Sequence, residues 1–458
     1  MPKLLPGSER TARYQTKMRL QRLGLLALYL PLPALTTITQ AGWPKQLCQQ
    51  TGVSYTRSRI DRLTHASGEQ EVMISAGRSL GTVLALGILV GLTPALVSHF
   101  SLSDFIEYWT AAHLFVHKQN PYSLNAMMQQ QRALGWNAPD PLMVMSPPQI
   151  LPLLVPLGLL RSFALARVMW LWLSALILVL ALMILSEVYG ATEHEQRNVM
   201  FAAAFFFPVW LCFVLGQIAP LLLLGVAGFL WFERRGCLFM AGAALAVTTL
   251  KPHLFYLVWV TVLLWAIEKR EIRMLAGAGL SSCVAIVAAL TVDGLVLSQY
   301  LALVQSSYIW AYLSGLGGLL RLILRGRHHF VQFAPMLPGL GALIWYWRRH
   351  RAHWIWRDNL PFVLTLSLLT AAYGWPFDEL VLLLPIVMVA VRCTSDSKTR
   401  RTAVAWLLTI SLASFAAVLV QGYAASMVIC ATAILVYLAL HETAMHHKYK
   451  SVSGYAIT

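Results

Sequence analysis

The sequence predicts an all-α polytopic membrane protein, and three observations carry that prediction. Hydrophobic residues make up 58% of the 458 residues and charged residues only 12%. Soluble domains carry roughly 25% charged residues, so about half of the usual charged surface is missing. From residue 80 onward, apolar runs alternate with short polar breaks. Because these runs are continuous and do not alternate residue by residue, they predict helices and not a membrane barrel.

The apolar runs predict about 11–13 transmembrane helices within residues 80–441. A helix needs about 20 residues to cross the hydrocarbon core, and several runs are shorter. Short helices favour a bundle around an internal cavity, and the proline-rich stretch 147–160 is expected to enter the membrane only partly. The candidate spans are 80–98, 165–186, 198–214, 218–232, 237–250, 254–267, 274–292, 329–347, 360–374, 379–391, 402–420 and 423–441.

The net charge of +16 follows the membrane pattern and does not indicate nucleic-acid binding. Basic residues cluster in short runs between apolar segments, for example at Arg234-Arg235 and Arg400-Arg401. Such runs are typical of cytoplasmic loops. We therefore expect a multi-pass protein of the cell membrane, with loop 99–145 and the breaks near residues 217, 251 and 374–379 on the extracytoplasmic side.

The chain divides into three predicted parts. Residues 1–79 hold eleven Lys and Arg against four acids and form a basic extension that is interfacial or partly disordered. Residues 80–441 form the transmembrane domain, and 442–458 a cytoplasmic tail. Met73 begins a short basic lead into the first span, so residues 1–72 are alternatively a dispensable extension.

The loop after the first span holds the most informative polar residues. Ser103 and Glu107 mark the start of a short helix near Asp104, with apolar residues at helical spacing that would lie flat on the membrane. Asp104 and Tyr108 share one face of this helix. A carboxylate beside apolar surface can act as a general base. The alternative is that Asp104 only caps the helix.

Two further breaks on the same side carry charge. Lys251, followed by Pro252 and His253, ends an apolar helix, where a lysine is costly unless it is paired. The alternative is a lysine that extends to the interface. The second break contains Tyr373, Trp375 and Asp378. An interfacial aromatic belt would explain Trp375, whereas Asp378 at membrane depth has no such explanation.

The segment 311–329 is amphipathic and basic. Arg321 and Arg325, four residues apart, could hold a lipid phosphate, or they could bind anionic headgroups without specificity. The six cysteines are scattered with no CxxC spacing, so no metal site or cofactor is predicted. Motifs of soluble nucleotide-binding enzymes, serine hydrolases and zinc proteases are also absent from the sequence.

Five sequence blocks, in order, resemble glycosyltransferase family 87, which has the GT-C fold. The blocks cover roughly residues 80–392. They are Asp104-Phe-x-x-Tyr-Trp-x-Ala-Ala, then Asn120-Pro-Tyr with Ser146-Pro-Pro, then Gly216-Gln217, Leu250-Lys-Pro, and Trp375-Pro-Phe-Asp-Glu-Leu. The chain departs from the family pattern at Ser146 and Phe377, where tyrosine is common, and at Tyr373, where histidine is common.

The resemblance implies an inverting transfer of a sugar, a mannose or another hexose, from a polyprenyl-phosphate donor to a lipid-linked or glycan acceptor. It implies no obligatory metal. Asp104 falls on the family's catalytic aspartate, and a cationic cradle would hold the leaving phosphate. The expected substrate-binding residues are Glu107, Tyr108, Gln217, Lys251, His253, Arg321, Arg325, Tyr373, Trp375 and Asp378.

Two other functions account for part of the sequence. A transporter or flippase for lipid-linked sugars would explain the helical bundle and its membrane-depth charges, but not the aromatic and acidic loop 99–145. The paired broken helices typical of transporters are not evident in the two halves. The third candidate is a catalytically inactive relative that binds lipid-linked sugar.

Overall fold

The computed structural model describes residues 103–306, 315–324, 329–392 and 397–420, with single positions between 425 and 438. All of them belong to one compact unit, Leu92–Thr458. Within these ranges every regular element is a helix, which confirms the predicted all-helical fold. The extension 1–79, the candidate span 80–98 and the tail 442–458 lie outside the described residues.

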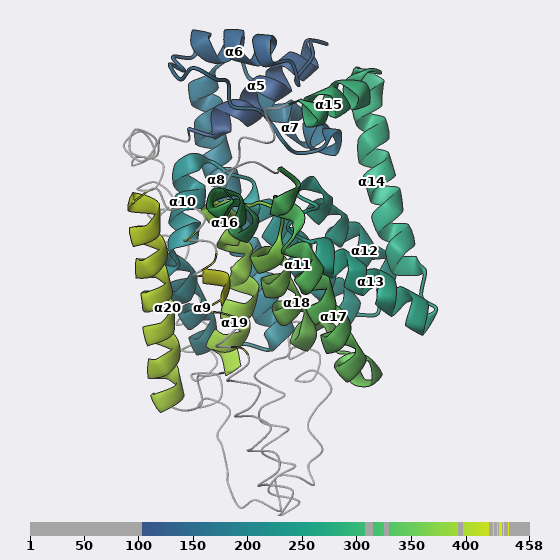
Figure 1. The fold of residues 1–458 in the computed structure, drawn as a ribbon, viewed down its shortest axis with the longest axis vertical. Coiled ribbons are helices and arrows are strands. Elements are labelled where there is room, and N and C mark those ends of the chain that lie inside the picture. The colour runs from purple at the N-terminus through teal and green to yellow at the C-terminus, as the bar shows by residue number, and fades with distance from the viewer. Residues whose placement is uncertain are drawn as a thin grey trace, which may run out of the picture. The chain divides into compact units, whose positions relative to one another are not determined.

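Helices of very unequal length follow one another along the chain (Figure 1). Their bounds are α5 (Phe105–Val116), α6 (Leu124–Ala133), η1 (Pro148–Ile150), α7 (Leu151–Gly158), α8 (Phe163–Tyr189), α9 (Glu193–Phe205), α10 (Phe207–Leu215), α11 (Ala219–Arg234), α12 (Leu238–Leu245), η2 (Ala246–Leu250), α13 (Tyr256–Lys269), α14 (Arg273–Val292), α15 (Val296–Gln305), α16 (Gly315–Ile323), η4 (His329–Phe333), α17 (Met336–His350), η5 (Arg351–His353), α18 (Trp356–Thr370), η6 (Pro376–Leu382), α19 (Leu383–Arg392) and α20 (Ser397–Leu419).

Three described helices are long and apolar enough to cross a membrane: α8, α14 and the part of α20 from Arg400 to Leu419. A fourth span results if α9 and α10, which are bent by 61° at their junction, count as one. Most other predicted spans are present as helices, but they are shorter than the ~20 residues that a crossing needs. The described residues therefore supply a polytopic helical fold with fewer full-length spans than the 11–13 expected.

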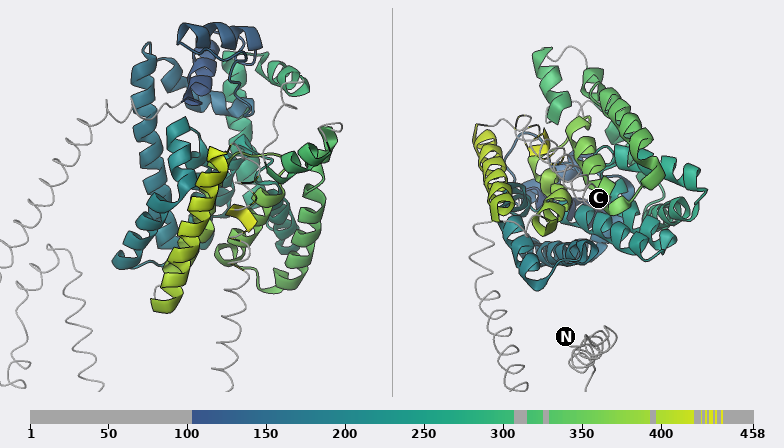
Figure 2. Two further views of the ribbon diagram at one scale, coloured as in Figure 1. Left: turned by 60° about the vertical axis from the view of Figure 1, so that its left-hand side comes forward. Right: turned by 90° about the horizontal axis from the view of Figure 1, so that it is seen from below.

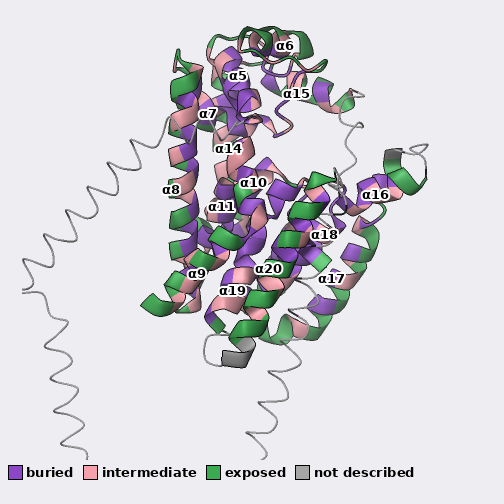
Figure 3. Ribbon diagram, turned by 90° about the vertical axis from the view of Figure 1, so that its left-hand side faces the viewer, coloured by how far each residue is buried: buried purple, intermediate pink, exposed green. Residues whose placement is uncertain are grey.

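Helix α8 shows why these residues form a span. The Ser162 hydroxyl accepts a hydrogen bond from the Leu165 N–H at its start, and Gly190, with φ 72°, ends it in the left-handed conformation. Its outer face carries large apolar side chains such as Leu176 and Met183 that remain exposed. Figure 3 shows such exposed residues along α8, α9 and α20, as expected of surfaces that face lipid. Helix α20 lies at the edge of the bundle in Figure 1 and in the right view of Figure 2.

Helices α5, α6 and α15 lie together at one end of the described unit (Figure 1). The helix predicted to begin near Asp104 is present as α5, but it is more buried than expected, since nine of its twelve residues are buried. It is apolar on all sides and packs against α6, α7 and α8. The contact with α7 is close, because a Cβ at Gly158 would lie 2.6 Å from the Ala112 carbonyl oxygen.

The proline-rich stretch forms only η1 and α7, which together span Pro148–Gly158. This is too short to cross a bilayer, in agreement with the expected partial entry. Further along the chain, α12 and α14 cross closely through glycines. A Cβ at Gly242 would lie 1.8 Å from the Met274 carbonyl oxygen, and one at Gly277 would lie 1.9 Å from that of Phe239. Small residues allow this kind of helix contact in membranes.

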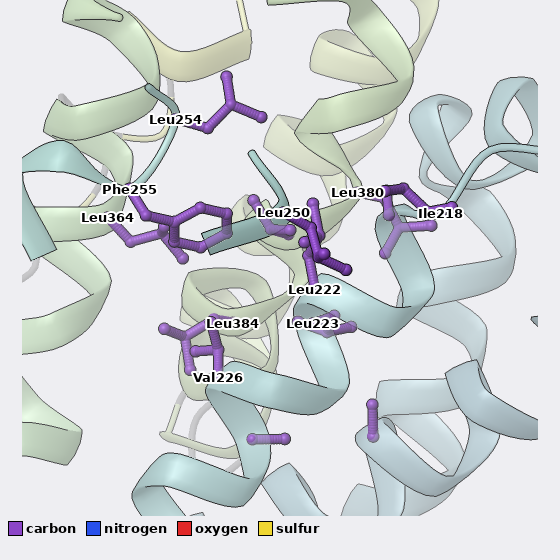
Figure 4. Packing of buried hydrophobic residues seen from close by; sticks show 14 of the residues in the cluster. Ile218, Leu222, Leu223, Val226, Leu250, Leu254, Phe255, Leu364, Leu380 and Leu384 are labelled. Atoms are coloured by element: carbon purple, nitrogen blue, oxygen red, sulfur yellow. The ribbon is translucent and has the colours of Figure 1, made fainter. Parts of the chain in front are cut away.

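Helix α11 supplies the centre of the core. Figure 4 shows its residues Leu222, Leu223 and Val226 beside Leu380 and Leu384, which come from η6 and α19. All five side chains are completely buried. The well-packed α11 therefore fixes the helices that follow it relative to those at the end of the chain.

Candidate active site

A cavity of about 300 Å³ lies where several helices break. Helix α10 ends at Gly216, η2 ends before Lys251, and α18 ends before the break at 371–375. The start of α5 and one face of α15 complete the walls. The polar and aromatic lining consists of Asp104, Glu107, Tyr108, Ser146, Gln217, Lys251, His253, Tyr300, Tyr373, Trp375, Phe377 and Asp378. All predicted site residues except Arg321 and Arg325 therefore meet in one cavity.

Asp104 occupies the N-cap position of α5, yet its side chain makes no capping hydrogen bond. One of its oxygens, Oδ2, accepts a hydrogen bond from the Gln217 amide at 2.8 Å. The Ser103 hydroxyl donates to Oδ1 at 3.3 Å. The other end of the Gln217 amide accepts a hydrogen bond from the Tyr108 hydroxyl, also at 2.8 Å. Asp104 is thus directed into the cavity by a side chain 113 residues away, and helix capping does not account for it.

The two carboxyl groups of this wall, Asp104 and Glu107, differ in how far their pKa values are raised. Burial raises the pKa of Asp104 above its usual value, while the hydrogen bonds from Gln217 and Ser103 and the charge of Lys251 partly offset this effect. Burial and the neighbouring charge of Asp104 raise the pKa of Glu107 much further. Both shifts favour the neutral form, and the shift is the larger for Glu107, so Asp104 is the more readily ionised of the two carboxyl groups.

The position of Gln217 follows from the end of α10. Gly216 adopts the left-handed conformation, with φ 80°, that ends the helix and turns the chain toward α5. Its carbonyl oxygen accepts a hydrogen bond from the Trp170 indole N–H at 2.7 Å. The Asp104 N–H donates to the carbonyl of Leu215 at 2.9 Å. Both backbone and side-chain bonds thus join the start of α5 to the end of α10.

Lys251 and Asp378 form a buried ion pair on another wall. The Lys251 ammonium lies 2.6 Å from Asp378 Oδ1. The second oxygen, Oδ2, accepts a hydrogen bond from the Trp375 N–H at 3.1 Å. The Lys251 side chain retains 13% exposure, whereas that of Asp378 has 1%. The ammonium also lies 4.9 Å from the centre of the Phe377 ring, a cation–π distance. The predicted need for a partner of Lys251 is met by Asp378.

Stacked rings form the rest of the polar lining. The rings of His253 and Tyr373 lie 3.9 Å apart at 24°, and those of Trp375 and Phe377 lie 6.2 Å apart at 13°. Burial and the charge of Lys251 lower the pKa of His253 to about 3. Its imidazole is therefore neutral at neutral pH and can donate or accept one hydrogen bond without carrying charge.

Two residues of this region were not predicted from the sequence. Tyr300, on α15, lines the cavity, and its ring lies 5.3 Å from that of Tyr122, whose hydroxyl donates to the Ser146 carbonyl. No pattern in the sequence around Tyr300 indicated this position. Trp170 supports the site from α8 and belongs to no recognisable motif.

Of the two predicted arginines, Arg321 does not line this cavity. Arg321 is buried on α16, and its guanidinium donates to the Gln332 side chain at 3.1 Å. Arg325 lies outside the described residues. Within the described ranges, no group of three His, Cys, Asp or Glu side chains is arranged to hold a metal ion.

Comparison with known proteins agrees with the family that the sequence blocks resemble. The sequence pattern of glycosyltransferase family 87 matches residues 145–372. No curated protein and no solved structure matches the chain. The matched region contributes Ser146, Gln217, Lys251 and His253 to the cavity, and the flanking Asp104 and Asp378 bond directly to residues within it. The chain, an all-helical membrane protein, therefore belongs to glycosyltransferase family 87.

Proposed function

We propose that this glycosyltransferase moves a hexose, with mannose the first candidate, from a polyprenyl-phosphate donor to a lipid-linked or glycan acceptor. The transfer inverts the anomeric carbon and takes place at the extracytoplasmic side of the cell membrane. The observation that supports this most strongly is the hydrogen bond of Asp104 to Gln217 inside the cavity. It leaves a partly buried carboxylate whose only charged neighbour of opposite sign among the described residues is Lys251.

In the proposed reaction, Asp104 acts as a general base. It removes the proton of an acceptor hydroxyl as that oxygen bonds to the anomeric carbon of the donor. The bond from this carbon to the phosphate oxygen breaks, and the electron pair leaves with the lipid phosphate. A base whose pKa is raised toward the working pH is well suited to this role. Burial raises the pKa of Glu107 well above that of a free carboxyl and so favours its neutral form, which is a poor nucleophile. This favours single displacement with inversion.

The leaving phosphate needs positive charge and hydrogen-bond donors. Lys251 is the cation of the described cavity lining, and Asp378 holds its ammonium in place. His253 follows Lys251 by two residues in the chain, and its neutral imidazole stacks on the ring of Tyr373, which carries a hydroxyl. We assign these groups to the phosphate because fixed donors near developing charge are the largest contribution to many enzymatic rate enhancements.

The charge pattern supports the proposed side of the membrane, and the family supports the proposed lipid donor. Basic runs such as Arg234-Arg235 lie at the opposite ends of the helices that lead to the cavity, and such runs favour the cytoplasm. The cavity would then be extracytoplasmic, where sugars are supplied on lipid carriers.

The test is turnover of the purified full chain with a polyprenyl-phosphate mannose, a polyprenyl-phosphate glucose and a nucleotide sugar, each with saccharide acceptors. We expect product only with a lipid-phosphate donor, and an anomeric configuration opposite to that of the donor by NMR. Binding without turnover would indicate an inactive relative, and movement of the intact donor across vesicle membranes would indicate a flippase. Either result would contradict the proposed transfer.

A further inference from the structure

A second cavity, of about 370 Å³, lies away from the proposed active site between α9, α19 and α20. Its lining is apolar apart from two residues, Asn198 on α9 and Arg400 on α20. None of its lining residues lines the cavity that contains Asp104. Its volume falls within the ~300–1,000 Å³ usual for ligand sites.

The bend between α9 and α10 creates this groove. Phe206 is extended between the two helices, and Pro208 stands in the first turn of α10, where a missing N–H is tolerated. The resulting bend of 61° turns α9 away from the direction of α10. Phe201 and Phe205 of α9 and Val404 of α20 line the groove and remain about half exposed or more. The groove is therefore open on the surface of the unit, where the helices face lipid.

The length of the groove along α20 matches one leaflet of a bilayer. Its lining on α20 runs from Arg400 to Ile410, or roughly 15 Å at 1.5 Å per residue. This is about half of the ~30 Å hydrocarbon core. Arg400 is the first residue of the part of α20 that is long and apolar enough to cross a membrane. A crossing by this segment would bring its guanidinium to the depth of the headgroups. An acyl chain in the groove would place its own headgroup beside Arg400.

The two polar residues of the lining favour an anionic headgroup. Among the described residues Arg400 forms no ion pair and is exposed. The side-chain nitrogen of Asn198 is buried and has no hydrogen-bond partner in that part of the chain. One cation and one amide donor on an otherwise apolar groove fit a phosphate followed by a hydrocarbon chain. We infer that this groove binds one anionic phospholipid, with an acyl chain along α20 and the phosphate at Arg400 and Asn198.

The test is native mass spectrometry of the detergent-solubilised full chain with phosphatidylglycerol, and in parallel with phosphatidylcholine. We expect one phosphatidylglycerol to bind more tightly than phosphatidylcholine. Arg400→Gln should weaken phosphatidylglycerol binding about fivefold, the effect of one arginine near a headgroup, and should remove the preference. Arg401→Gln is the matched control, because Arg401 is its exposed neighbour and does not line the groove.

A second variant tests the acyl chain. Ala403→Phe places a ring in the groove and should abolish tight binding of both lipids, while the melting temperature shows whether the variant is folded. Unchanged phosphatidylglycerol binding in Arg400→Gln would overturn the inference, as would displacement of the lipid by equimolar polyprenyl phosphate, which would assign the groove to the donor's chain. Sugar transfer is not part of this measurement, so its outcome is independent of the proposed function.

Discussion

The two aspartates that line the active-site cavity differ in what holds them. Asp104 accepts hydrogen bonds from a neutral amide and a hydroxyl. Asp378 accepts from an ammonium at 2.6 Å and from a backbone N–H. The partners of Asp104 orient it without cancelling its charge. Asp378 would have to give up an ion pair in order to take a proton from a substrate.

The hydrogen-bond or ion-pair partner of each aspartate, and not its residue type, therefore determines which carboxylate can serve as a base. Both aspartates stand at helix starts in apolar surroundings, and from the sequence alone either could be a cap, a base or a ligand. Only the contacts distinguish a base from a counter-ion. The following predictions test that distinction, beginning with the largest expected effect.

Replacing Asp104 with Asn should remove the base and keep the fold. The asparagine Oδ1 can still accept from Gln217, but it cannot take the acceptor proton. We expect turnover to fall at least ~10²–10⁴-fold, the usual contribution of a general base. Initial rates with a polyprenyl-phosphate donor, beside a thermal melt, measure both effects. If Asp104→Asn retains turnover and Glu107→Gln loses it, the general base is Glu107 and not Asp104.

Removing Lys251 should destabilise the protein, because it leaves a buried charge on Asp378. Lys251→Met is expected to cost about 3–5 kcal/mol of unfolding free energy, the usual effect of breaking a buried pair. The double variant Lys251→Met with Asp378→Leu removes both charges and should recover most of that stability. Unfolding in detergent measures this.

Activity should not recover in the same double variant, because the cation proposed for the leaving phosphate is still missing. A double variant that is no more stable than Lys251→Met would show that Asp378 does not depend on the ammonium for its burial. A stable and active double variant would instead show that Lys251 serves only to neutralise Asp378 and does not bind the leaving phosphate.

Much of the fold could be predicted because apolar runs depend on local sequence alone. The run predicted at 274–292 is α14, and the run at 165–186 is α8 with a few residues added at each end. The burial of α5 was less visible, because its partners α7 and α8 come later in the chain. The bend at Phe206 also escaped prediction, since 198–214 is one uninterrupted apolar run around Pro208.

Some site residues could be predicted because a charged side chain at a helix end within the membrane is costly unless it is paired. Lys251 and Asp378 were each identified singly, yet nothing in the sequence indicates that they pair across 127 residues. Gln217 was expected to contact substrate, whereas its amide is engaged by Asp104 and Tyr108. Tyr300 has no unusual chemistry in its local sequence. Its place depends on α15 folding over the cavity, which no local pattern encodes.

The hydrogen bond from Gln217 should control the acid limb of the pH–rate profile. Asp104 must be ionised to act, and burial raises its pKa, so activity is full above that pKa and falls as the pH drops through it. The Gln217 amide lowers the pKa, so Gln217→Leu should raise it further and shift the acid limb to higher pH. We expect turnover at neutral pH to fall about tenfold, which corresponds to one lost hydrogen bond to a charged group of ~1.5 kcal/mol.

Gln149→Leu is the matched control for that measurement. The Gln149 amide donates to Thr249 and does not line the active-site cavity. Its loss should leave the acid limb in place. If the acid limb moves equally in both variants, or in neither, then the Gln217 amide does not control the pKa of Asp104.

Tyr108→Phe should give the smallest effect of the series, because the Tyr108 hydroxyl bonds to Gln217 and not directly to Asp104. Without the hydroxyl, Gln217 Oε1 loses its donor at 2.8 Å, and the amide is less firmly oriented. We expect a loss of ~0.5–1.5 kcal/mol in stability and an acid limb that moves in the same direction as in Gln217→Leu, but less far. Tyr122→Phe is the control, since its hydroxyl donates to the Ser146 carbonyl. It should cost similar stability and leave the limb unchanged. If Tyr122→Phe also shifts the limb, the shift reflects loosened packing of the cavity wall, and the specific role of Tyr108 in holding the base through Gln217 is lost.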